Sequence, residues 1–195
     1  MQTSLKKMFQ KASIQRTKEL ESLGLSRPRL RSLVSKGLLE QSSRGLYSLP
    51  DKGVSENRTL AEVAKRVPLG VICLLSALRF HKLTTQAPHE VWLALDRTAW
   101  SPTMDHIKLR ITRFSGAAFD EGHEQYLIEG VPVRITTPAK TVADCFKYRN
   151  KIGLDVAMEA LREVRRERLC TMSELMHFAR ICRVANVMKP YLESL

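Results

Sequence analysis

The sequence predicts an α+β protein of two parts, with two short helices and a hairpin in residues 1–55 and a larger mixed domain in residues 56–195. Three observations support this prediction. Apolar residues recur at helical spacing around a basic segment near the N-terminus, short alternating runs follow between residues 90 and 135, and helical spacing returns after residue 137. The polar stretch from Asp51 to Arg58 is the expected linker.

The chain is strongly basic, with a formal net charge of +12. Residues 1–55 contain 11 Lys and Arg against four Asp and Glu, so +7 of this charge lies in the N-terminal part. A positive excess attracts nucleic acid or an anionic membrane and does not by itself choose between them. The longest apolar run, Val67 to Leu78, is too short and too interrupted to span a bilayer, and the N-terminus lacks the apolar segment of a signal peptide. We therefore expect a cytoplasmic protein with no membrane partner.

The four cysteines indicate no metal site. They lie far apart, without a C-x-x-C pair or a histidine at zinc-finger spacing. Free Cys behaves as a small hydrophobic residue, so buried thiols in a reducing compartment are expected. We expect neither a metal nor a cofactor. The residues are Cys73, Cys145, Cys170 and Cys182.

Two short helices are predicted between Thr17 and Gly37. Thr17 can cap the first, in which Leu20 and Leu23 share a face, and Gly24 can end it in a left-handed conformation. Ser26 can cap the second, because Pro28 is tolerated in a first helical turn, and Gly37 closes it.

The second helix has an apolar stripe, Leu30, Leu33 and Val34, that must face the rest of the domain. Its opposite side is polar and basic, and is the face that a DNA major groove would meet. Arg can read guanine and Ser several bases, so Arg27, Arg29 and Ser32 are candidate base contacts. The predicted DNA-binding residues are Ser26, Arg27, Arg29, Arg31, Ser32, Lys36 and Arg44.

A hairpin is predicted after this helix. Leu38 to Gln41 and Leu46 to Pro50 suit two short strands around the polar turn 42–45. Arg44 at the tip would reach the DNA backbone or minor groove. The order of cap, apolar stripe, basic helix and hairpin is that of a winged helix-turn-helix. Basic helices are also common as solvated faces and in protein-binding modules, and the coincidence of all these signals favours DNA.

The mixed domain is predicted to contain helices, a small and largely antiparallel sheet, and a helical C-terminal part. Glu129-Gly130 is a plausible hairpin turn between two of its strands. The predicted helices are Leu60 to Val67, Val71 to Phe80, a segment beginning at Pro138, Leu154 to Val164, Ser173 to Cys182 and a weaker terminal segment. The predicted strands are Glu90 to Leu95, Ile107 to Phe114, Gln125 to Ile128 and Val131 to Ile135.

Catalytic motifs are not evident. The sequence contains no G-x-x-x-x-G-K-[ST] loop, G-x-S-x-G elbow or H-E-x-x-H helix. The acidic group Asp120, Glu121 and Glu124 lies in a stretch that we expect to be a solvated loop. Asp144 is expected to be structural, paired with Lys140 one helical turn earlier.

Three segments carry a family resemblance. Ile14 to Pro50, with Leu-Gly-Leu-Ser, Val-Ser-Lys-Gly-Leu-Leu-Glu and Arg-Gly-Leu-Tyr-Ser-Leu-Pro, resembles the N-terminal winged helix of AbiEi-family antitoxins. Ser76 to Thr85 and Pro138 to Phe146 resemble the second domain of that family. The resemblance implies a non-enzymatic repressor that binds double-stranded DNA of its own promoter. It also implies a type IV toxin-antitoxin system, in which the protein counteracts an AbiEii-type nucleotidyltransferase-like toxin without needing a stable complex.

Two alternatives stay open from the sequence. One is an orphan winged-helix transcriptional regulator whose second domain senses a ligand or mediates assembly. The other is a nucleic-acid-processing enzyme that uses the winged helix for targeting, with the acidic loop as its catalytic group.

Overall fold

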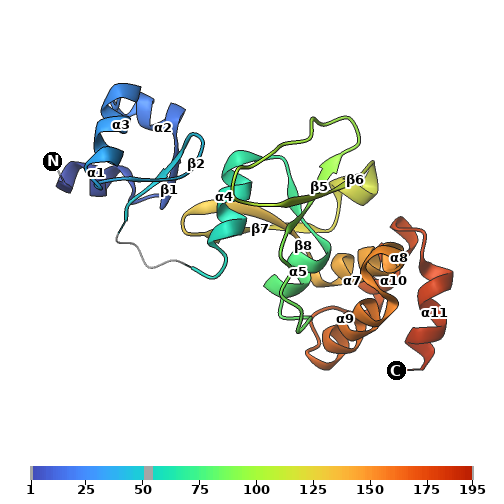
Figure 1. Ribbon diagram of the computed structural model, residues 1–195. Helices are drawn as coiled ribbons and strands as arrows, with labels where there is room; N and C mark the ends of the chain where they lie inside the picture. Colours follow the sequence, from blue (N-terminus) through green and yellow to red (C-terminus); the bar gives the residue numbers. More distant parts are fainter. Residues whose placement is uncertain (1, 51–54, 195) are drawn as a thin grey trace. The chain divides into compact units, whose positions relative to one another are not determined.

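The computed structural model describes residues 2–50 and 55–194, so residues 51–54 of the predicted linker lie outside the described residues. The chain divides into two compact units. The first comprises residues 1–69, 102–108 and 126–133, and the second residues 70–101, 109–125 and 134–195 (Figure 1). The mixed α+β architecture with a helical C-terminal part is confirmed.

The N-terminal segment of the first unit combines helices with a three-stranded antiparallel sheet of order β1-β3-β2. Its buried core residues include Phe9, Leu20 and Leu30. Helix α1 and strand β1, at the start of the chain, precede the predicted elements and were not predicted. The elements are α1 (Gln2–Met8), β1 (Ile14–Arg16), α2 (Thr17–Ser22), α3 (Arg27–Ser35), β2 (Glu40–Ser43), β3 (Leu46–Ser48) and α4 (Arg58–Arg66).

The start of α2 differs from the prediction. Arg16, not Thr17, occupies the N-cap position, and its backbone N–H donates to the Glu19 carboxylate at 2.6 Å. Leu20 is fully buried, whereas Leu23 is 48% exposed because it lies at the C-cap, past the last helical turn. The predicted end is confirmed, since Gly24 adopts a φ of +90° and the Leu25 N–H donates to the Leu20 carbonyl.

The second sheet has the order β6-β5-β4-β8-β7 and is followed by a group of helices that runs to the C-terminus (Figure 1, orange to red). Its predicted strands and the hairpin at Glu129-Gly130 are confirmed, and both turn residues have positive φ. The elements are β4 (Val71–Ile72), α5 (Leu74–Phe80), β5 (Val91–Asp96), β6 (Leu109–Phe114), α6 (Ala117–Asp120), β7 (His123–Ile128), β8 (Val131–Thr136), α7 (Pro138–Lys147), α8 (Arg149–Ile152), α9 (Leu154–Arg166), α10 (Met172–Ile181) and α11 (Ala185–Glu193).

This five-stranded sheet is mixed rather than largely antiparallel. The β4–β5 pairing is antiparallel, but β4–β8 and β5–β6 are parallel. Parallel neighbours need a crossover connection of a dozen or so residues, and the segment 97–108 between β5 and β6 provides it. The helix predicted from Val71 begins only at Leu74, because Val71 and Ile72 pair with β5 and β8 in the middle of the sheet.

No helix among the described residues is both long enough and apolar enough to cross a membrane.

Replacing Leu30 by Ala should lower the free energy of unfolding by about 2–5 kcal/mol, because its buried side chain would leave a cavity in the N-terminal core. Leu23→Ala is the matched control, since it removes the same atoms from a half-exposed position of the same unit and should cost about 0.5 kcal/mol or less. Urea denaturation followed by circular dichroism measures both. Equal losses would contradict the core assignment.

Candidate nucleic-acid interface

Helix α3 is short and sharply bounded. Ser26 lies at its N-cap in an extended conformation, although its side chain makes no capping hydrogen bond, and Pro28 falls in the first turn as expected. At the other end Gly37 has a φ of +65°, and the Leu38 N–H donates to the Leu33 carbonyl at 2.9 Å. The predicted helix bounds are therefore confirmed.

The apolar stripe of α3 faces the N-terminal core. Leu30 and Leu33 are 0% and 1% exposed, and both belong to the cluster that contains Leu20 and Leu39, with Val34 packed against it. A helix that buries one stripe must turn the opposite side to solvent. The basic and polar residues of α3 lie on that remaining surface.

The predicted site residues lie on α3, at its two caps and in the turn of the β2–β3 hairpin. Arg27, Arg29 and Arg31 are exposed, and Ser32 is half-buried on the same helix. The other three predicted residues, Ser26, Lys36 and Arg44, are exposed as well.

An ion pair within this surface was not anticipated from the sequence. The Arg27 guanidinium Nε lies 2.8 Å from a carboxylate oxygen of Glu21 on α2, while the Arg27 side chain stays 69% exposed. A surface pair of this kind adds about 1 kcal/mol or less to stability. Its consequence is geometric, since it restrains the direction of a side chain at the start of α3.

The hairpin tip is tied to the start of α2. β2 and β3 are joined by the two-residue turn Arg44-Gly45, shorter than the predicted turn 42–45 because Ser42 and Ser43 belong to β2. The backbone N–H of Thr17 donates to the Gly45 carbonyl at 3.0 Å. Gly45 has a φ of +80°, a conformation that suits a tight hairpin turn. The exposed Arg44 side chain is thus carried by an anchored backbone.

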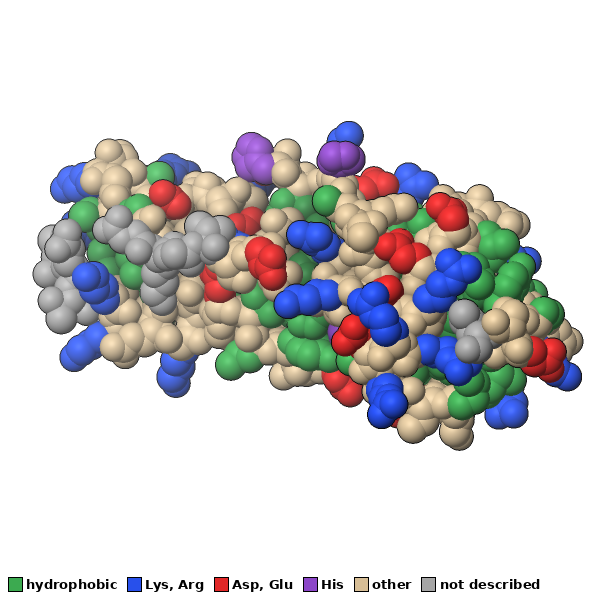
Figure 2. Space-filling view, turned by 90° about the horizontal axis from the view of Figure 1, so that it is seen from below, with side chains coloured by type: hydrophobic (Ala, Val, Ile, Leu, Met, Phe, Trp, Pro, Cys, Tyr) green, Lys and Arg blue, Asp and Glu red, His purple; other side chains and the backbone are tan. Residues whose placement is uncertain are grey.

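The charges on the face drawn in Figure 2 do not form one continuous patch. Lys and Arg side chains stand at separate positions, and over the C-terminal helices (right) they alternate with Asp and Glu. The net charge alone therefore does not define an anion-binding surface on this face.

The acidic group that could have indicated an enzyme is solvent-exposed. All three side chains are exposed, as predicted, but the predicted loop is wrong, because Asp120 ends α6 and Glu124 lies in β7, and Glu121 lies between these two elements. A carboxylate oxygen of Glu121 lies 3.4 Å from Nε2 of the His177 ring. Among the residues that the structure describes, no three His, Cys, Asp or Glu side chains are grouped to hold a metal ion.

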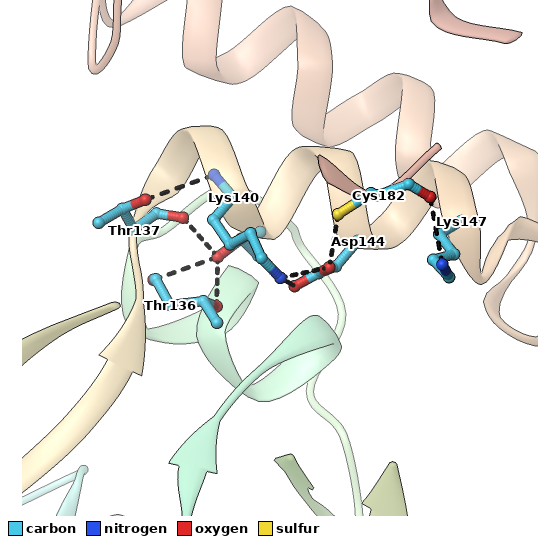
Figure 3. A network of polar contacts seen from close by, with 7 residues as sticks. Thr136, Thr137, Lys140, Asp144, Lys147 and Cys182 are labelled. Carbon is cyan, nitrogen blue, oxygen red and sulfur yellow. Dashed lines mark hydrogen bonds and ion pairs between the residues drawn. The ribbon is translucent and has the colours of Figure 1, made fainter. Parts of the chain in front are cut away.

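A buried polar network occupies the core of the second unit (Figure 3). Lys140 Nζ lies 2.6 Å from both carboxylate oxygens of Asp144, one helical turn along α7, and the two side chains are 0% and 1% exposed. The thiol of Cys182 donates to Asp144 at 3.2 Å, and the ammonium lies 4.5 Å from the centre of the Phe114 ring. The predicted structural role of Asp144 is confirmed, because solvent does not reach it.

Burial controls the protonation of this network. Desolvation raises the pKa of the Asp144 carboxyl, and the Lys140 ammonium opposes this shift. Desolvation and the Asp144 charge raise the pKa of the Cys182 thiol to about 12, so it stays a protonated hydrogen-bond donor. Cys73 and Cys145 are buried free thiols, as expected, whereas Cys170 is partly exposed.

Threonines connect the network to the end of β8. The Thr137 hydroxyl accepts the Lys140 backbone N–H and caps α7 (Figure 3). Thr141 Oγ1 donates to the Thr137 carbonyl at 2.8 Å. Thr136 and Thr141 share a hydroxyl–hydroxyl hydrogen bond of 2.7 Å. Lys147 Nζ then donates to the carbonyl of Cys182, which is the C-cap residue of α10.

Two successive helices, α2 and the basic, exposed α3, are followed by the β2–β3 hairpin. Residues 10–50 match the model of a family described as transcriptional regulator, AbiEi antitoxin. The resemblance predicted for the N-terminal segment is confirmed over these residues, and it indicates a general role as a regulator or antitoxin. No curated protein matches the chain. The resemblance of residues 76–85 and 138–146 to the second domain of that family stays a prediction.

Replacing Asp144 by Ala should lower the free energy of unfolding by about 3–5 kcal/mol, because it leaves the Lys140 ammonium buried without a partner. The double change Lys140→Met and Asp144→Leu should cost less than this single change, since it removes both buried charges. Chemical denaturation of the two variants measures the difference. A double variant that is as unstable as Asp144→Ala, or more so, would contradict the assigned pairing.

Proposed function

We propose that this protein is a DNA-binding transcriptional repressor that acts as the antitoxin of a type IV toxin-antitoxin system. The observation that carries the proposal is the exposed basic face of α3, opposite Leu30 and Leu33, within the segment that matches AbiEi regulators. The N-terminal domain, residues 1–55, is then a winged helix-turn-helix whose wing is the β2–β3 hairpin.

In this proposal α3 lies in the major groove of double-stranded DNA from the protein's own promoter. Arg27, Arg29 and Ser32 contact base edges, where an Arg can bind the O6 and N7 atoms of guanine. Phosphate contacts fix the position of the helix without reading sequence. Ser26, Arg31 and Lys36 have that role, and Arg44 on the hairpin reaches the DNA backbone or minor groove.

Residues 56–195 form the second domain of the proposed antitoxin, which counteracts an AbiEii-type nucleotidyltransferase toxin. The likeness of residues 76–85 and 138–146 to AbiEi second domains supports this part of the proposal. The proposed antitoxin activity does not require a stable antitoxin–toxin complex. The proposal includes no catalytic step, metal or cofactor for this chain. Repression of its own operon would link the amount of antitoxin to promoter occupancy.

The DNA contact is tested by fluorescence anisotropy on DNA from upstream of the gene and on scrambled DNA, at several salt concentrations. Arg29→Ala should weaken promoter binding by about 1–3 kcal/mol and reduce the preference over scrambled DNA, because a base contact is lost. Lys189→Ala, which removes one exposed positive charge from α11, is the control and should keep the preference. Unchanged promoter preference in Arg29→Ala would overturn the assignment of α3.

The antitoxin role has a separate test in growing cells. Co-expression of this protein should restore growth that is arrested by a nucleotidyltransferase-like protein encoded beside its gene. Expression of that neighbour alone establishes that it is toxic. Arrest that persists despite normal levels of this protein would refute the antitoxin role and leave an orphan transcriptional regulator.

A further inference from the structure

The two tryptophans of the chain have opposite environments. Trp92, on β5, is 5% exposed and belongs to the core of the second unit. Trp100, in the connection after β5, is 74% exposed. An exposed indole does not contribute to a hydrophobic core, so Trp100 is free to contact a ligand or a partner.

The loop that carries Trp100 is fastened by the side chain of Arg113 on β6. One terminal nitrogen of its guanidinium, Nη1, donates to the carbonyls of Asp96 at 2.8 Å and Ala99 at 2.6 Å. The other, Nη2, donates to the Ser101 hydroxyl. These acceptors lie on both sides of Trp100 along the chain, so a single side chain fixes the loop around it.

A second set of hydrogen bonds closes the start of the same loop. The Asp96 carboxylate accepts the backbone N–H of Thr98 at 2.9 Å and its hydroxyl at 2.7 Å. These bonds lower the pKa of the Asp96 carboxyl below its ordinary value, because they favour its ionised form. The Ala99 N–H also donates to the Asp96 carbonyl. The indole is therefore presented by an ordered turn, and binding through it would require little further ordering of the backbone.

The loop that carries Trp100 also exposes a cation. Arg97 is exposed three residues earlier, and the loop 97–101 contains no acidic residue. Among the described residues, the other exposed large apolar side chains belong to other segments: Leu23, Leu69, Leu127, Leu154, Leu169 and Met172. An aromatic anchor of a protein interface would usually be ringed by other contacts that exclude water. A loop that exposes both an indole and a cation instead suits a ligand with a flat ring and a negative charge.

We propose that the 97–101 loop binds an unpaired nucleotide of a single-stranded nucleic acid, with the base stacked on Trp100 and its phosphate near Arg97. Stacking of this kind tolerates any base, because every base has an aromatic face. Paired bases within a duplex hide their faces, so this site is distinct in chemistry from the duplex contact assigned to α3. DNA and RNA strands share the ring and the phosphate that the loop would recognise.

Acrylamide quenching of tryptophan fluorescence tests the proposal, because exposed Trp100 should be quenched and buried Trp92 protected. The probes are a 12-nucleotide oligodeoxyadenylate, its RNA counterpart and the same DNA strand in a duplex with its complement. The single strands should protect Trp100 from acrylamide, and the duplex should not. Protection by only one of the two strands identifies DNA or RNA as the source of the nucleotide.

Variants make the assignment specific. Trp100→Ala should weaken single-strand binding, measured by anisotropy of a labelled oligonucleotide, by about tenfold or more, and Trp100→Phe should restore part of the affinity. Arg97→Ala should reduce the dependence of binding on salt. Promoter binding by Trp100→Ala should match that of the unchanged protein, which separates this site from the proposed α3 contact. Unchanged single-strand affinity in Trp100→Ala, equal protection by the duplex, or protection that appears only as protein concentration rises would overturn the proposal.

Discussion

Burial of Leu30 and Leu33 determines which side of α3 faces solvent, and the exposure of the basic residues of α3 depends on it. The two side chains pack with Leu20 and Leu39 in a small core, so rotating the helix would expose apolar surface and bury cations without partners. Gly24 follows the end of α2 and Gly37 follows the end of α3, both with positive φ. The direction of the basic residues is thus a consequence of apolar packing, not of any attraction among them.

The second unit depends on a different constraint. Its core contains a complete ion pair, and an uncompensated charge at either position would be costly. The stretch Pro138 to Phe146, which stood out in the sequence, serves this purpose: Pro138 starts α7, and Lys140 and Asp144 lie one turn apart within it. Its position in the core agrees with the structural role that the sequence predicted for Asp144.

Elements with a strong periodic pattern or a turn motif could be predicted from the sequence. Very short strands, whose conformation depends on pairing with neighbouring strands, could not. The α3 stripe and the Glu129-Gly130 turn carry their own local signals. β1 and β4 are only three and two residues long, so their strand conformation comes from neighbours in the sheet rather than from alternation. The parallel pairing of β5 with β6 has no local signal either.

The candidate site shows the same division. Exposure of Arg27, Arg29 and Arg31 followed from the position of the apolar stripe, since residues of a helix that lie off its buried face must face solvent. The Glu21–Arg27 ion pair joins two helices, and its geometry depends on how α2 packs on α3. Likewise, no spacing rule connects Arg113 with the loop that presents Trp100.

Methylation interference on the promoter tests the placement of α3 most directly, because guanine N7 lies in the major groove and adenine N3 in the minor groove. N7 methylation at particular guanines should block binding of the unchanged protein. At one of these guanines, N7 methylation should no longer affect binding of Arg29→Ala. Interference confined to adenine N3, or an identical guanine pattern in both proteins, would contradict the reading of DNA by α3.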